Sequence, residues 1–66
     1  MRLSVNGEPR EVPSGITIAQ LLELLRLERT QVAVEVNANV VRRALHAEHA
    51  LSDGDQVEIV TFVGGG

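Results

Sequence analysis

The sequence has no cysteine, no lysine, no tryptophan and no tyrosine, and it has only 66 residues. Without cysteine no disulfide can form, and the two histidines, His46 and His49, have no third ligand at a spacing that would hold a metal ion. A single domain of this length buries only about 60% of the surface that its unfolded chain exposes. The fold must therefore depend on strong local signals and on a compact aliphatic core.

Aromatic residues and clustered positive charge are also scarce. Phe62 is the only aromatic residue, the net charge is −3, and only Arg42 and Arg43 among the arginines are adjacent. The basic patch and the stacking surface of nucleic-acid-binding proteins are therefore missing. No segment approaches the roughly 20 apolar residues of a membrane span, and the alternating residues after Met1 do not resemble a signal peptide. We expect no nucleic-acid partner, no membrane association and a cytoplasmic location.

The sequence ends in Val63-Gly64-Gly65-Gly66. At ordinary glycine usage, three glycines at given positions occur by chance about once in 3,000 sequences. Glycine has no Cβ, so such a strip can enter a channel too narrow for other residues, and three extended residues span about 10 Å. We interpret these glycines as a tail that carries a terminal carboxylate into a partner's active site for activation by a nucleoside triphosphate. The residues alone equally allow a passive, flexible end.

The first twelve residues predict a β-hairpin. Residues 1–6 alternate between apolar and polar, which is typical of a half-buried strand. Asn6-Gly7 then favours a type I′ turn, in which both central residues have positive φ. Residues 8–12 form the returning strand, and Pro9, which lacks an N–H group, places that strand at an edge of the sheet.

An amphipathic helix is predicted to follow, ending near residue 27 without a clear C-capping glycine. Thr17 and Gln20 form a Thr-x-x-Gln capping box at its start. Its apolar face has helical spacing and consists of Ile18, Leu21, Leu22 and Leu25. We interpret this face as core packing rather than as an exposed partner-binding helix, because the chain has no other helix to cover its sheet. Leu24 lies off this face and is expected to cover a sheet edge.

The second half of the chain predicts three more strands. Residues 32–36 place three valines on one face, and a turn at 37–39 leads to a short strand at 40–41. Residues 42–50 are expected to form a loop with one helical turn, with His46 and His49 at the surface. A tight turn at Asp53-Gly54 precedes a final strand over 56–63. This last strand is apolar on both faces near its end, which indicates a central position parallel to the first strand.

The predicted order is β-β-α-β-β-β, an α+β fold in which a mixed sheet packs on one helix. The crossover between the second and third strands is long enough for such a connection. We expect one domain over residues 1–63 and a flexible glycine tail over 64–66.

This order, the length and the glycine end resemble the β-grasp fold of ubiquitin-like proteins. Four segments resemble the ThiS family of sulfur carrier proteins of thiamine biosynthesis: Met1–Glu8, Val34–Asn37, Leu51–Val60 and Val63–Gly66. Together these segments extend the resemblance over essentially the whole chain. Members often have Pro-Arg where this chain has Arg42-Arg43, which affects the expected path of that loop. The sister family, the small subunit of molybdopterin synthase, is usually longer and often has prolines before its Gly-Gly. This chain has neither feature, which favours the ThiS family.

The resemblance implies a carrier that contains no catalytic residue, no metal and no bound cofactor. An E1-like adenylyltransferase of the ThiF type would use ATP to adenylate the Gly66 carboxylate. Sulfur from a donor such as a cysteine desulfurase persulfide would displace AMP and leave a thiocarboxylate. The carrier would then deliver sulfur to a thiazole synthase of the ThiG type, with Gly64, Gly65 and Gly66 threading into each partner.

A docking face is predicted beside this tail. By the two-residue period of a strand, Val57 and Ile59 face the helix, while Val60 and Phe62 face the other way as an exposed apolar patch. A bulge near Thr61 could instead turn Phe62 into the core. Three other functions also remain open: a carrier of the molybdopterin synthase type, a ubiquitin-like protein modifier, and a regulatory β-grasp domain with a passive tail.

Overall fold

A computed structural model describes residues 1–62 of the chain. The predicted domain boundary at Val63, the last residue of the predicted final strand, and the glycine tail 64–66 therefore lie outside the described residues. Within the described part, no helix is both long and apolar enough to cross a membrane.

The chain begins with the predicted hairpin. Strands β1 (Arg2–Val5) and β2 (Glu8–Glu11) pair in antiparallel register. The turn residues Asn6 and Gly7 have φ values of 51° and 84°, as a type I′ turn requires. Strand β2 lies at the edge of the sheet, so the position predicted from Pro9 is confirmed.

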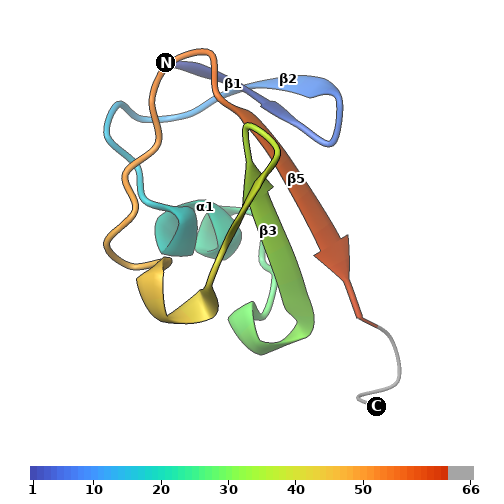
Figure 1. Ribbon diagram of the computed structural model, residues 1–66. Helices are drawn as coiled ribbons and strands as arrows, with labels where there is room; N and C mark the ends of the chain where they lie inside the picture. The colour runs from blue at the N-terminus through green and yellow to red at the C-terminus, as the bar shows by residue number, and fades with distance from the viewer. Residues whose placement is uncertain (63–66) are drawn as a thin grey trace.

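The sheet has five strands in the order β2-β1-β5-β3-β4. Its second half consists of β3 (Val32–Val36), β4 (Asn39–Val41) and β5 (Gln56–Thr61). Strand β5 lies in the centre, parallel to β1 and antiparallel to β3, and it runs toward the C-terminal end of the chain (Figure 1). This confirms the predicted α+β architecture, a mixed sheet of order β-β-α-β-β-β on one helix.

One α-helix, α1 (Ile18–Leu24), lies against one face of this sheet (Figure 1). Its predicted capping box is present: the Gln20 N–H donates to Thr17 Oγ1 at 3.1 Å, and the Thr17 N–H donates to Gln20 Oε1 at 2.9 Å. The helix buries three residues of its predicted apolar face, so the interpretation as core packing is confirmed. Leu24, which was expected to cover a sheet edge, is 49% exposed.

The core between helix and sheet is aliphatic. Its buried members come from α1, from every strand except β2 and from the loops beside them: Leu3, Val5, Val12, Ile16, Ile18, Leu21, Leu22, Val32, Val34, Val36, Val41, Leu51, Val57 and Ile59. All three valines of β3 belong to this set, as their alternation predicted. Within residues 1–62, the last residue of the core is Ile59.

The end of α1 shows how the helix stops without glycine. Arg26 adopts the left-handed conformation with φ of 61°. The Arg26 N–H donates to Glu23 O at 3.0 Å, and the Leu27 N–H donates to Leu22 O at 2.9 Å, which together form a Schellman motif. The left-handed region costs a residue with a Cβ about 1–2 kcal/mol, so this end of the helix is strained.

Arg26→Gly should therefore raise the free energy of unfolding by about 1 kcal/mol, because glycine adopts positive φ without the Cβ clash. Urea unfolding of the two chains measures the difference. Arg26→Ala is the matched control, since it removes the guanidinium and keeps the Cβ. Equal gains in the two variants would attribute the effect to the arginine side chain and contradict the backbone argument.

The loop from 42 to 50 contains the largest departure from the sequence analysis. After a short 3₁₀ helix, η2 (Arg43–Leu45), His46 is 1% exposed, so its predicted surface position is wrong. Its Nε2 donates to Val41 O at 2.9 Å, and its Nδ1 is buried with no hydrogen-bond partner within residues 1–62. The main chain explains the burial: His46 O and His49 O accept the N–H groups of Ala19 and Ile18, both at 3.0 Å. The loop is thereby held against the first turn of α1, where those groups lack helical partners.

The remaining turns lie close to their predicted positions. Asn37 and Ala38 join β3 to β4 with φ values of 51° and 70°. Gly54, with φ of 87°, forms the turn before β5, where the Ser52 N–H donates to Asp55 Oδ2 at 2.8 Å. A second 3₁₀ helix, η1 (Arg29–Gln31), leads into β3.

Candidate functional site

The end of β5 is the structural feature that leads to the predicted tail. Along this strand Val57 and Ile59 are buried against the helix side, whereas Val60 and Phe62 are 56% and 57% exposed. The Phe62 N–H donates to Gln31 O at 2.8 Å, which continues the register of β5 with β3. The alternative in which a bulge turns Phe62 into the core is therefore wrong. The exposure of both predicted docking residues is confirmed, and their docking role stays a prediction.

The face of the sheet turned away from α1, the outer face, gathers further apolar side chains beside these two. Val60 lies directly opposite the half-buried Ala33 of β3. Val40 of β4 lies opposite Glu35 and is 70% exposed, and its diagonal neighbour on β3 is Ala33. Ala33, Val40, Val60 and Phe62 form what we call the outer patch. The sequence analysis missed Ala33 and Val40.

Two carboxylates border the outer patch. Glu35 of β3 and Glu58 of β5 are directly opposite one another, an arrangement in which like charges repel. No arginine side chain described in the structure pairs with either one, and the ion pair found within residues 1–62 joins Arg2 to Glu11 at 2.9 Å. A partner with basic side chains around an apolar centre would relieve this repulsion. The alternation in the sequence assigns both glutamates to the outer face, but only the strand order shows that they are neighbours.

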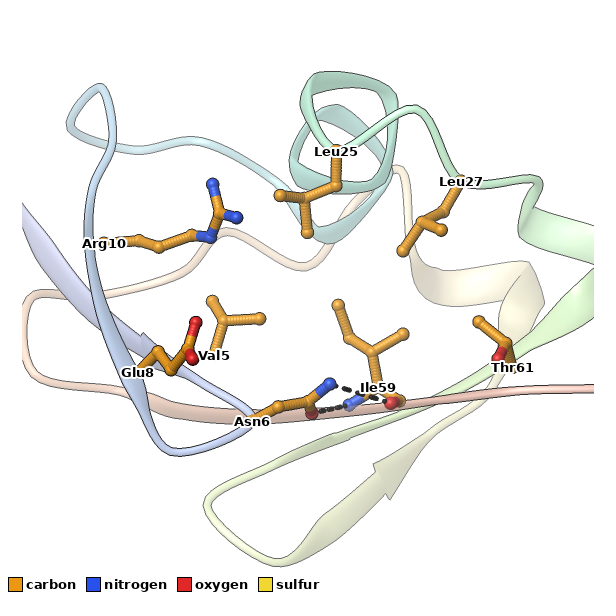
Figure 2. Close-up of a pocket in the computed structure, with 8 residues that line it drawn as sticks. All are labelled: Val5, Asn6, Glu8, Arg10, Leu25, Leu27, Ile59 and Thr61. Atoms are coloured by element: carbon orange, nitrogen blue, oxygen red, sulfur yellow. Dashed lines mark hydrogen bonds between the residues drawn. The ribbon is translucent and has the colours of Figure 1, made fainter.

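On its other edge, β5 pairs with β1 as far as Val57, and a side chain takes over at Ile59. The Ile59 N–H donates to Asn6 Oδ1 at 2.7 Å, and Asn6 Nδ2 donates to Ile59 O at 3.1 Å (Figure 2). Strand β1 ends at Val5, so the amide of Asn6 supplies the donor and acceptor that the next residue of β1 would have supplied. This Asn6–Ile59 bridge fixes the direction of β5 two residues before the last residue of the strand, Thr61. The sequence analysis assigned Asn6 to the turn alone.

A cleft of about 360 Å³ opens beside the bridge, on the helix side of the sheet (Figure 2). Apolar side chains from β1, β5 and the end of α1 line its interior, whereas charged side chains of β2 stand at its rim. The lining comprises Val5, Asn6, Glu8, Arg10, Leu25, Leu27, Ile59 and Thr61. The end of β5 thus lies between an apolar cleft on one face and the outer patch on the other.

The chemistry of this region is suited to holding a partner. Its described side chains are aliphatic, aromatic, amide, hydroxyl, guanidinium or carboxylate groups, and both histidines lie in the loop against α1. Within residues 1–62 no three side chains of the metal-binding types come together. The arrangement offers apolar contact area on both faces of β5, and the Asn6–Ile59 bridge fixes the direction of this strand.

The model of the ThiS family matches residues 3–66, nearly the whole sequence. The chain belongs to the ThiS family. The sulfur carrier protein ThiS of Escherichia coli is 30% identical to it over 66 residues, with both chains covered completely. The crystal structure of the thiamine biosynthesis protein ThiS from Geobacter metallireducens superposes on it with a TM-score of 0.86 at 36% identity, again with full coverage of both chains.

Longer relatives also contain a ThiS-like segment. A thiazole synthase of Paramagnetospirillum magneticum is 42% identical over 66 residues, which cover all of this chain and 20% of that protein. The chain therefore spans about a fifth of the length of the thiazole synthases that it matches. ThiS-like sequence thus occurs both as a protein of this size and as part of a larger one.

Proposed function

We propose that this ThiS-family chain is a sulfur carrier of thiamine thiazole synthesis, and that its reactive group is the carboxylate of Gly66. One observation carries the proposal: in a ThiS-family fold, the strand that leads to the glycines exposes Val60 and Phe62 on a face with an apolar patch. The chain would act as a co-substrate in the cytoplasm, binding no cofactor of its own. ATP would be bound by its activating partner.

The chemistry has three steps. In the active site of an E1-like adenylyltransferase of the ThiF type, a Gly66 carboxylate oxygen attacks the α-phosphorus of ATP and pyrophosphate leaves. Sulfur from a persulfide donor, such as that of a cysteine desulfurase, then attacks the acyl carbon and AMP leaves; a thiol reduces the resulting disulfide to free the thiocarboxylate. The thiocarboxylate, a strong nucleophile that needs no neighbouring base, transfers its sulfur on a thiazole synthase of the ThiG type.

The folded body contributes by binding. Fixing the backbone of each of the three tail residues in a channel costs roughly 1–2 kcal/mol. Contacts of the outer patch with the partner must offset this cost, and Phe62 is the aromatic residue available for such an anchor. A peptide of the tail alone should therefore be a poor substrate.

Incubation of the 66-residue chain with a ThiF-type enzyme, ATP and sulfide tests the proposal. Intact mass spectrometry should show the gain of one sulfur-for-oxygen exchange, and omission of ATP should abolish it. The positive control is the carrier protein from the same organism as the enzyme. If the enzyme activates that carrier and the mass of this chain stays unchanged, the proposal is refuted. Conjugates with other proteins would instead indicate a protein modifier, and sulfur transfer only to a molybdopterin synthase large subunit would indicate the sister pathway.

Phe62→Ala should slow loading roughly 30-fold, the effect expected from loss of an interface anchor worth about 2 kcal/mol. Since Phe62 is 57% exposed, the free energy of unfolding should change little. Rates of adenylation and urea unfolding measure the two effects. Leu24→Ala, which truncates a similarly exposed side chain on the helix, is the matched control. A loss of several kcal/mol of stability in Phe62→Ala would show that the ring is core and contradict the docking role.

A further inference from the structure

The hydrogen bonds of β5 alternate in direction along the strand. The Phe62 N–H donates to Gln31 O, and Gln56 O accepts the Asn37 N–H, at 2.8 and 2.7 Å. In an antiparallel pair only every second residue exchanges hydrogen bonds with its opposite neighbour. The even-numbered residues of β5 therefore point their main-chain groups at β3, and Val57, Ile59 and Thr61 point theirs at β1.

The main-chain groups of these three residues differ in their hydrogen-bond partners on the β1 side. Val57 O accepts the Asn6 N–H at 2.8 Å, and Ile59 is bound through both main-chain groups by the Asn6 side chain. Thr61 comes next, beyond the end of β1, and its register partner Val32 lies on the other side. By this alternation the N–H and C=O of Thr61 point away from β3, and no strand of residues 1–62 pairs with them beyond the end of β1. The N–H and C=O of Thr61, the last residue of the central strand, are therefore placed to pair with an added β-strand.

The surroundings of this free edge match an extended peptide. An added strand in line with β1 would point alternate side chains to the helix side of the sheet, where the cleft lined by Ile59, Leu25 and Leu27 lies (Figure 2). Exposed strand edges of this kind pair with extended segments of other chains. Glu8 and Arg10 at the rim carry opposite charges, so the cleft favours an apolar side chain over one of either sign.

We propose that the main chain of Thr61 receives an extended segment of the adenylating partner as an added strand, with one apolar side chain of that segment in the cleft. This inference rests on the proposed function, and it concerns a contact other than the outer patch. Thr61 lies five residues before Gly66 in the sequence, so the protein that binds the tail is the partner best placed to supply this strand. Two copies of this chain paired here would share only the hydrogen bonds of Thr61, too small a contact for a stable dimer.

Thr61→Pro is the direct test, because it removes the N–H that no described intramolecular hydrogen bond uses. Proline and the residue before it are both compatible with extended backbone, so the melting temperature should stay close to that of the original chain. Adenylation by a ThiF-type enzyme should fall roughly tenfold, since the carbonyl of the partner strand is left unpaired. Thr61→Val, which keeps the N–H and the shape of the side chain, should load much faster than Thr61→Pro.

Hydrogen exchange of the unmodified chain supplies a second readout that does not depend on the proline. The Thr61 amide should exchange fast in the free carrier and slowly in the complex, whereas the Ile59 amide should be protected in both. Equal loading of Thr61→Pro and the original chain, or an unchanged Thr61 exchange rate in the complex, would overturn the strand proposal alone. Failure of the original chain to load at all would overturn the proposed function and this inference together.

Discussion

Removal of Gly65 and Gly66 should abolish activation of this chain by a ThiF-type enzyme, with a loss of more than about 100-fold in the rate of adenylation. The reason is positional: a displacement of about 1 Å in a reacting group can cost 100-fold in rate, and this deletion moves the carboxylate back by two residues. The deleted residues are glycines without side chains, and the last core residue within residues 1–62 is Ile59, so the melting temperature should not change. Mass spectrometry of loading reactions and thermal unfolding measure the two effects.

Gly65→Ala is the graded control for this deletion, because it keeps the length of the chain and adds one methyl group. A narrow channel that accepts only glycine should make this variant slow to adenylate, again with an unchanged melting temperature. Normal adenylation of Gly65→Ala would contradict threading through such a channel. Continued formation of thiazole in cells that contain only the shortened chain would contradict the role of the tail itself.

Local signals explain why so much of the fold could be predicted from the sequence. Asn6-Gly7 allows few turns other than type I′, and Thr17 with Gln20 can satisfy each other only at the start of a helix. The apolar run near the end of β5 predicts a central strand parallel to β1. Each of these predictions depends on residues that are neighbours in the sequence, and each is confirmed.

The features that were missed depend on contacts between distant segments. His46 is buried because its carbonyl caps the first turn of α1, which its own neighbours in the sequence do not reveal. Arg26 and Ala38 adopt positive φ, where sequence rules expect glycine or asparagine, because one ends α1 in a Schellman motif and the other is the second residue of a two-residue hairpin turn. The pairing of Glu35 with Glu58 follows from strand order and register alone.

Asn6→Ala should lower the free energy of unfolding by about 2–5 kcal/mol. Loss of the two hydrogen bonds to Ile59 contributes about 0.5–1.5 kcal/mol each, and a Cβ without a compensating side chain at φ of 51° adds about 1–2 kcal/mol. Domains below about 70–80 residues rarely gain more than 3–5 kcal/mol from a single core, so this variant should be close to unfolding. Urea unfolding measures the change.

Two further substitutions separate the side-chain bridge from the backbone conformation. Asn6→Gly tolerates positive φ but lacks both hydrogen bonds, so it should be more stable than Asn6→Ala and less stable than the original chain. Asn6→Asp keeps the acceptor for the Ile59 N–H but places a carboxylate oxygen against Ile59 O, so it should also lose stability. If Asn6→Gly were as stable as the original chain, the bridge would contribute nothing to the fold.

The same series links stability to function, because the bridge lies two residues before Thr61. In Asn6→Gly the Ile59 amide should lose its protection from exchange, while the Leu3 and Val34 amides in the core keep theirs. A strand end that is free to move presents the tail in many directions, so loading should slow even under conditions where the variant is fully folded. Loading at the original rate by a folded Asn6→Gly would show that the direction of β5 is set by β3 alone, and that Asn6 serves only the hairpin.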